Sequence, residues 1–95
     1  MTISIIATVK ILEGKMEEAK AALRRIVPKI KESEPGTIEY SPFTVKDKPN
    51  IIVFIEKYAD EAALKAHGAN LRKNMAEFNP CCVPERPAIQ SLEEI

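Results

Sequence analysis

Residues 2–12 alternate between two faces along the chain. One face contains only apolar residues, namely Ile3, Ile5, Ala7, Val9 and Ile11. A period of two and an excess of β-branched residues predict a β-strand here. Ile6 and Leu12 interrupt the second, more polar face. We therefore expect a strand that is partly covered on both sides.

The period changes to that of an α-helix after Gly14. The apolar stripe contains Met16, Ala19, Leu23, Ile26, Val27 and Ile30. Pro28 lacks an N–H group and crowds the preceding turn, which predicts a kink or a break. The stripe continues to Ile30, so a kinked helix is the better interpretation. Residues 34–36, Glu-Pro-Gly, are expected to end it.

Two more strands are expected at residues 37–45 and 51–58, on either side of a polar turn at residues 46–50. This arrangement is typical of an antiparallel hairpin. The first of these strands has an apolar face made of Ile38, Tyr40 and Pro42. Pro42 cannot donate a ladder hydrogen bond, so it indicates a sheet edge or a bulge.

A second helix is expected to begin at Asp60, a favourable N-cap residue, and to end at residues 79–80. Its buried face would contain Leu64, Leu71, Met75 and Phe78. A proline-rich segment, residues 83–87, leads to a weak last strand at residues 88–95. The order is therefore strand, helix, strand, strand, helix, strand.

This order is that of the ferredoxin-like βαββαβ fold of the α+β class. Both helices would cover one face of a four-stranded antiparallel sheet. The other face is also apolar, because Ile6, Leu12 and residues 51–55 contribute to it. An exposed apolar sheet normally marks an interface, and a twofold dimer with facing sheets would cover it. We predict one domain spanning residues 1–95 and a homodimer.

The charge balance of the chain argues against some classes of binding partner. The 95 residues include 14 Lys and Arg and 14 Asp and Glu, so the formal net charge is zero. This balance argues against non-specific nucleic-acid binding and against polybasic membrane binding. No apolar run approaches the roughly 18 residues of a transmembrane helix. The N-terminal segment lacks the pattern of a signal peptide, so we expect a cytoplasmic location.

Cys81 and Cys82 are the only cysteines and are adjacent. Two adjacent thiols do not form a disulfide framework. They could form a redox-sensitive pair or bind a soft metal, or they could simply pack at the domain edge. Metal sites usually need three or four ligands, so no metal site is predicted. A Cys–His nucleophile would require this loop to fold back over His67.

His67, the only histidine, lies within the apolar stripe of the second helix and is expected to face the sheet. It is either a buried neutral side chain held by one hydrogen bond or a general base that contacts a substrate. Asn70 and Asn74 follow near the same edge. They could orient His67 or donate to a substrate oxygen, or they could only cover the helix edge.

Glu56 and Tyr58 share a strand face with Ile52 and Phe54. A carboxyl group in such surroundings has a raised pKa unless it is paired, which would suit proton transfer. The alternative is a salt bridge from Glu56 to Lys10, to Lys57 or to an arginine of the first helix. Tyr40 is expected at the edge of a cavity or in the dimer interface, and its hydroxyl would need a partner.

The segments EPGTIEYSPF and IEKYADEAALKAH resemble the antibiotic biosynthesis monooxygenase superfamily, whose members are dimeric α/β barrels. The second segment matches the family pattern of an acid, an aromatic residue, a leucine and a histidine at Glu56, Tyr58, Leu64 and His67. The segment IVPKIKESEPGTIEYSP is similar to the quinol monooxygenase branch. The resemblance covers residues 3–79.

The resemblance implies a monooxygenase that inserts oxygen into a quinol or a related phenolic or polyketide aromatic, without metal, flavin or haem. His67 and Glu56 would be catalytic, and Tyr40, Tyr58, Asn70 and Asn74 would bind the small aromatic substrate. The second histidine of many relatives is missing near Arg72. The absence of tryptophan, with Ala7 and Thr8 on the first strand, argues against haem degradation. A non-catalytic small-molecule-binding or stress-related dimer and an isomerase or lyase are the alternatives.

Overall fold

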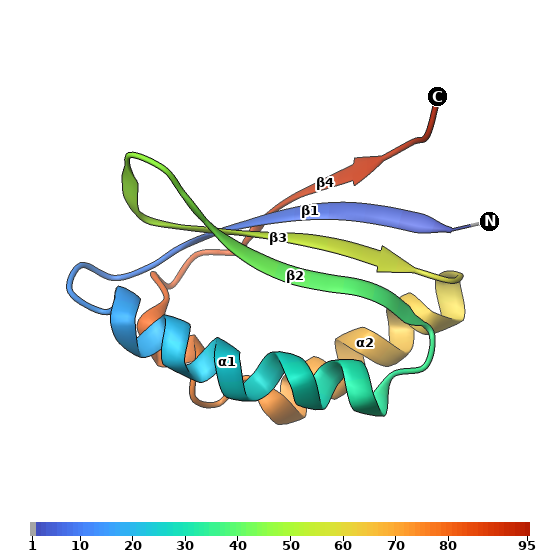
Figure 1. Cartoon of the computed structure of the whole chain (residues 1–95), viewed down its shortest axis with the longest axis horizontal. Helices are drawn as coiled ribbons and strands as arrows, with labels where there is room; N and C mark the ends of the chain where they lie inside the picture. The colour runs from blue at the N-terminus through green and yellow to red at the C-terminus, as the bar shows by residue number, and fades with distance from the viewer. Residues whose placement is uncertain (1) are drawn as a thin grey trace.

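The computed structural model describes residues 2–95. Its elements are β1 (Ile3–Lys10), α1 (Met16–Ser33), β2 (Thr37–Val45), β3 (Lys48–Tyr58), α2 (Glu61–Asn74), the short 3-10 helix η1 (Asn79–Cys81) and β4 (Ala88–Leu92). The strands form one antiparallel sheet in the order β2-β3-β1-β4. Both helices lie on one face of this sheet (Figure 1). The predicted ferredoxin-like α+β fold is confirmed.

Strand register decides which side chains face the helices. Glu56 lies opposite Ile5 on one side and opposite Tyr40 on the other. Phe54 lies opposite Ala7. Directly opposite residues share a face of the sheet, and all five of these side chains are buried. This face and the helices therefore enclose the core.

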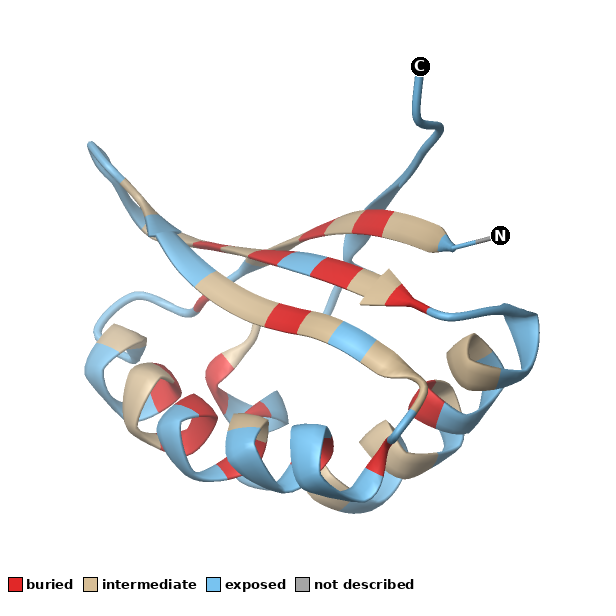
Figure 2. Cartoon of the chain, turned by 45° about the vertical axis from the view of Figure 1, so that its right-hand side comes forward, coloured by how far each residue is buried: buried red, intermediate tan, exposed pale blue. Residues whose placement is uncertain are grey.

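The core lies between the sheet and α1, with contributions from the segment around η1. Figure 2 shows the buried residues of α1 on the side that faces the sheet, and they are Ala19, Ala22, Leu23, Ile26 and Ile30. Pro28 lies inside this helix, which continues through it to Ser33. Its side chain is exposed, so the ring does not disturb the buried stripe. The helix is not broken at Pro28, as expected, and the kink stays a prediction.

The first strand is shorter than residues 2–12 because its end connects to another element. Ile11 forms an isolated bridge with Cys82, and the Leu12 N–H group donates to the Cys81 carbonyl at 2.8 Å. The hairpin is tighter than expected, since β3 begins at Lys48 rather than at residue 51. Asp47 adopts φ 68° in the turn, a left-handed conformation that aspartate tolerates better than most residues.

Two expectations about buried faces and one about a strand boundary were wrong in detail. Ile38 is 56% exposed whereas Tyr40 is 2% exposed, because a bulge between Thr37 and Glu39 shifts the register. The helix α2 ends at Asn74, so the buried Met75 and Phe78 lie beyond its last turn, and its own leucines are only partly buried. The last strand stops at Leu92, and every residue in it is exposed (Figure 2).

The second face of the sheet has no helix over it (Figure 1). Ile6 pairs with Ile55 and Phe43 pairs with Val53 on this face. Phe43 is 51% exposed and Ile55 is 38% exposed. A sheet face of this composition is typical of an interface. Among the described residues, neither helix combines the length and the apolar character that crossing a membrane would require.

Candidate active site

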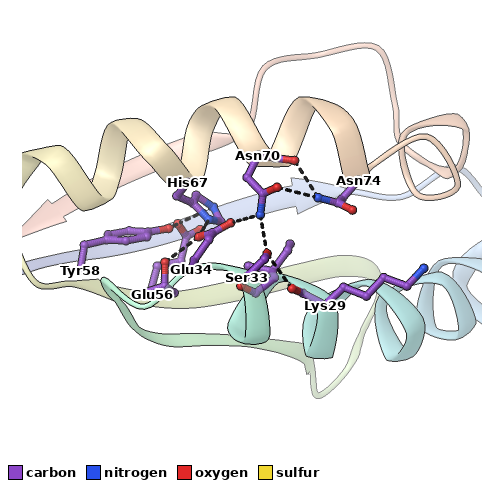
Figure 3. A network of polar contacts seen from close by, with 10 residues as sticks. Lys29, Ser33, Glu34, Glu56, Tyr58, His67, Asn70 and Asn74 are labelled. Atoms are coloured by element: carbon purple, nitrogen blue, oxygen red, sulfur yellow. Dashed lines mark hydrogen bonds and ion pairs between the residues drawn. The ribbon is translucent and has the colours of Figure 1, made fainter.

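Four elements bring polar side chains together at one end of the core (Figure 3). Glu34 is the C-cap residue of α1, Tyr40 comes from β2, Glu56 and Tyr58 come from β3, and His67 comes from α2. The start of α2 is fixed as predicted, because the Asp60 side chain accepts a hydrogen bond from the Ala63 N–H group at 2.8 Å. His67 is two turns further along and is the buried residue of that helix.

The imidazole of His67 lies between two carboxyl groups. Its Nδ1 atom is 2.8 Å from Oε1 of Glu34, and its Nε2 atom is 3.9 Å from Oε1 of Glu56. The first distance is a hydrogen bond and the second is too long for one. A carboxylate at Nδ1 favours the tautomer in which Nδ1 holds the proton, so Nε2 keeps a free lone pair. This is how a buried acid prepares a histidine to act as a base.

Glu34 is held in its ionised form by hydrogen bonds. Its carboxylate accepts from Thr37 Oγ1 at 2.6 Å and from Asn70 Nδ2 at 2.6 Å, in addition to His67. Burial alone would raise the pKa of Glu34, but these hydrogen bonds together lower it below its usual value. The negative end of the α1 dipole also opposes an anion here, so these donors are needed to stabilise the charge.

Glu56 has the opposite electrostatic environment. Burial raises its pKa, although a hydrogen bond from the Tyr58 hydroxyl and the nearby His67 partly oppose this effect. The alternative of an ion pair was wrong: within residues 2–95, no lysine or arginine pairs with Glu56, and Lys10 pairs with Glu85 at 3.4 Å. Glu56 is therefore suited to holding a proton beside Nε2 of His67.

Aromatic rings surround the imidazole. The ring centroid of His67 is 4.9 Å from that of Tyr40 and 5.1 Å from that of Tyr58, and Tyr40 stacks on Phe54 at 5.3 Å. Burial, followed by the charge of Glu56, raises the pKa of Tyr40 above its usual range. Burial raises the pKa of Tyr58 as well. Both phenols therefore remain protonated, and the Tyr58 hydroxyl donates a hydrogen bond to Glu56.

A cavity of about 430 Å³ opens beside His67, between the sheet, α2 and the segment that leads to β4. Its lining is mostly apolar, and Tyr40, Glu56 and His67 are the predicted site residues that line it. A groove of about 520 Å³ between α1 and β2 has no histidine or carboxylate in its lining, so the cavity at His67 is the better candidate site. A volume of this size is typical of a small-molecule site.

The cavity lies on the helix-covered side of the sheet, within one chain. His67 faces the sheet, as expected, and the register places Glu56 and Phe54 on this helix-covered side. Phe43 is on the opposite face. Phe54 and Met75 line the cavity and leave it open.

The other residues that were predicted to bind the ligand contact neighbouring site residues and do not line the cavity. Tyr58 is fully buried and does not line the cavity. Asn70 donates to Glu34 and to Ser33 Oγ, the latter at 2.9 Å (Figure 3). Asn74 donates to the backbone carbonyl and to Oδ1 of Asn70, at 2.9 and 3.0 Å. The interpretation that these asparagines could orient His67 thus has a physical path through Glu34.

The cysteine loop folds back over the site. Cys81 is buried in the core, whereas Cys82 lines the same cavity as His67. Burial raises the pKa of the Cys82 thiol to about 11, and the neighbouring Cys81 adds to this effect. A thiol with such a pKa is a poor nucleophile at neutral pH. Within residues 2–95 there is no group of three or more His, Cys, Asp or Glu side chains arranged to hold a metal ion.

Glu34 is the functional residue that sequence reasoning missed. It was interpreted only as part of the helix stop at residues 34–36. One signal was available, because Glu34 lies four residues after Ile30 and so continues the apolar stripe of α1. A carboxylate on a buried stripe requires hydrogen-bond partners, and those partners come from β2 and α2.

Comparison with known proteins identifies the family of the chain. The model of the antibiotic biosynthesis monooxygenase family matches residues 2–72, a range that includes Glu34, Glu56 and His67. The chain belongs to this family. A comparison with curated proteins gives no significant match.

Solved structures extend the family likeness to almost the whole chain. One is a candidate antibiotic biosynthesis monooxygenase from Caulobacter crescentus, with 27% identity, a TM-score of 0.86, and 99% of this chain aligned to 90% of that one. Another is a protein from Shewanella oneidensis, with 29% identity, a TM-score of 0.79, and 96% of this chain aligned to 88% of that one. A third, described as an antibiotic biosynthesis monooxygenase, shares the fold at 24% identity. Its TM-score is 0.83, and 100% of this chain aligns to 99% of that one.

Proposed function

We propose that this member of the antibiotic biosynthesis monooxygenase family oxidises a quinol or a related phenolic aromatic with dioxygen, and that His67 is the general base. The observation behind this proposal is the Glu34–His67 pair, because the contact at Nδ1 leaves Nε2 free and His67 lines a mostly apolar cavity. A buried carboxylate–histidine pair stabilises the imidazolium that forms when the base accepts a proton.

The reaction begins with loss of the substrate hydroxyl proton to Nε2 of His67. The electron pair remains on the ring, and the electron-rich anion passes one electron to dioxygen. The superoxide and ring radicals combine to form a carbon–oxygen bond. The distal peroxide oxygen is protonated, and the oxygen–oxygen bond breaks as the ring carbon loses its hydrogen. One oxygen atom stays in the product and the other leaves as water, so the ring itself is the reductant.

Glu56 and Tyr40 have complementary roles in this scheme. Glu56 lines the cavity near His67, and its raised pKa suits it to deliver the proton to the peroxide. Tyr40 also lines the cavity and remains protonated, so its hydroxyl is available to hydrogen-bond a substrate oxyanion. Tyr58, Asn70 and Asn74 hold the two acids in place and affect the substrate through them.

We further propose that the working unit is a homodimer in which a second copy covers the apolar outer face of the sheet. Phe43, Ile55 and Leu92 are exposed on that face in a single chain. Covering them removes apolar surface from water, which favours association. The cavity opens on the opposite side of the sheet, so each chain would keep its own site.

Oxygen consumption with menadiol, a reduced naphthoquinone, tests the proposal. The uncatalysed oxidation of menadiol is subtracted. We expect His67→Ala to lower kcat by about 100- to 10,000-fold, because general-base catalysis contributes about that much. Lys65→Gln is the matched control, since this exposed residue is on the same helix and does not line the cavity.

Two results would contradict the assignment. Equal rates for the wild type and His67→Ala would remove His67 from the mechanism. A product formed without oxygen consumption would point to the isomerase or lyase alternative. Circular dichroism of each variant checks that the fold is retained, so that a loss of activity reports on the chemistry.

A further inference from the structure

The positive and negative side chains that line the cavity do not all form ion pairs with one another. Apart from His67, the cavity is lined by Glu56, Arg72 and Glu85. Glu85 is paired with Lys10 at 3.4 Å, and burial favours the neutral form of Glu56 through its raised pKa. Among residues 2–95, no acidic group lies within ion-pair distance of Arg72. Among the described residues that line the cavity, Arg72 is therefore the permanently charged side chain that no ion pair neutralises.

The helix places this cation further along the cavity wall than the base. Arg72 follows His67 by five residues, which is a rise of about 7.5 Å along the axis of α2 and a rotation of about 140° around it, and both residues line the cavity. An aromatic ligand that spans the cavity from His67 therefore meets Arg72 at another part of the wall. The apolar walls between them suit the ring itself.

Gly68 leaves this cation accessible. It lines the cavity one turn before Arg72, and a Cβ atom at Gly68 would meet nothing within 4 Å. Helical side chains lean toward the N-terminus of their helix, so the Arg72 side chain leans over the surface that Gly68 leaves bare.

We propose that Arg72 binds a carboxylate on the ligand, so that the cavity selects aromatic acids whose acidic group is remote from the end that faces His67. The planar guanidinium matches the two oxygen atoms of a carboxylate. The mostly apolar walls accept the ring, and the lone cation selects its substituent. This inference rests on the proposed function only in assigning the other end of the ligand to His67.

Calorimetric titration of the full chain with 2-naphthoate tests the inference without any turnover. Its neutral methyl ester is the matched ligand. We expect the wild type to bind naphthoate at least 10-fold more tightly than the ester. Arg72→Gln should weaken naphthoate binding by about 10- to 100-fold, the usual value of a hydrogen bond to a charged group, and leave the ester unaffected. Arg72→Lys should recover part of the loss.

Lys73→Gln is the control, because it removes the same charge from the next residue, which does not line this cavity. Equal binding of naphthoate and ester, an equal loss in both glutamine variants, or no binding of naphthoate would overturn the inference. Oxygen consumption with a carboxylated naphthoquinol, in which Arg72→Gln should raise KM and leave kcat near wild type, gives a separate result. Selective naphthoate binding without oxygen consumption would reject the proposed monooxygenase activity and leave the role of Arg72 standing.

Discussion

At the scale of single residues, the site is one imidazole between two acids whose environments differ. Three hydrogen-bond donors lower the pKa of Glu34, whereas burial raises the pKa of Glu56. Groups whose pKa values are moved apart in this way take different roles in proton transfer. Glu34 can remain an anion that orients His67, and Glu56 can hold the proton that a later step consumes.

This difference predicts opposite effects of pH on the stability of two variants. The usual pKa of the carboxyl group is 4.5. Since folding lowers the pKa of Glu34, its stabilising effect is present above pH 4.5 and is lost as the pH falls through the lowered value. We expect Glu34→Gln to cost about 1–3 kcal/mol of unfolding free energy at neutral pH. This deficit should shrink in acid.

Glu56→Gln should behave in the reverse way. Folding raises the pKa of Glu56, so the favourable protonated state is present below pH 4.5 and is lost as the pH rises through the raised value. The variant mimics that protonated state, so it should match the wild type in acid and exceed its stability at higher pH. Urea unfolding of all three proteins across this range measures both effects. Parallel pH curves would contradict the assignment of the two acids.

Part of this site could be predicted from the sequence. His67 and Glu56 were found because each interrupts an apolar pattern in its own element, at a helical or a strand period. Glu34 was not, because its partner His67 is 33 positions away and the link exists only in three dimensions. The proximity of Glu56 to His67 instead of a lysine could not be predicted from the sequence pattern either, since it depends on how α2 crosses the sheet.

At the scale of elements, the site depends on a close approach between the loop after α1 and the first turn of α2. A Cβ atom at Gly36 would lie 2.5 Å from Cβ of Ala63. The carbonyl of Gly36 also accepts a hydrogen bond from the Ala59 N–H group at 2.9 Å. This contact fixes where α2 begins relative to Glu34, two residues before Gly36.

We therefore predict that Gly36→Ala separates the loop from α2 and lengthens the contact between Glu34 and His67. The added methyl group should cost about 1–3 kcal/mol, as is usual for overpacking, and should lower turnover with menadiol. Gly68→Ala is the matched control for stability, because its Cβ atom meets nothing within 4 Å and alanine favours a helix interior. Thermal unfolding measures both variants. Equal stability of the two would show that the approach at Gly36 is not a constraint.

The elements themselves were predicted well where one pattern dominated. The apolar stripe of α1 correctly predicted that the helix continues past Pro28. The N-cap residue Asp60 correctly predicted where α2 begins. The boundaries failed where tertiary contacts decided them. The bridge from Ile11 to Cys82 follows β1, and the left-handed Asp47 tightens the hairpin. Neither feature has a signal in hydrophobic periodicity.

At the scale of the whole molecule, the two faces of the sheet differ, because the helices cover only one of them. The helix-covered face contains the core and the cavity, and the outer face exposes Phe43, Ile55 and Leu92. The sequence predicted that the outer face is apolar, because Ile6 and residues 51–55 break the alternation. It did not separate this face from the site, since a continuous apolar run gives no indication of which side each residue faces.

A substitution on the outer face of the sheet tests the proposed dimer. Ile55 lies on the central strand β3 opposite Ile6, so in a twofold dimer Ile55→Lys would place an unpaired charge in the interface of both copies. We expect the wild type to be dimeric by light scattering at micromolar concentration, and the variant to have a dissociation constant raised by more than about 100-fold. Ala76→Lys adds the same charge at an exposed position after α2, and this control should remain dimeric. A monomeric wild type would contradict the dimer. Equal dissociation constants for the wild type and Ile55→Lys would show that another surface joins the two copies.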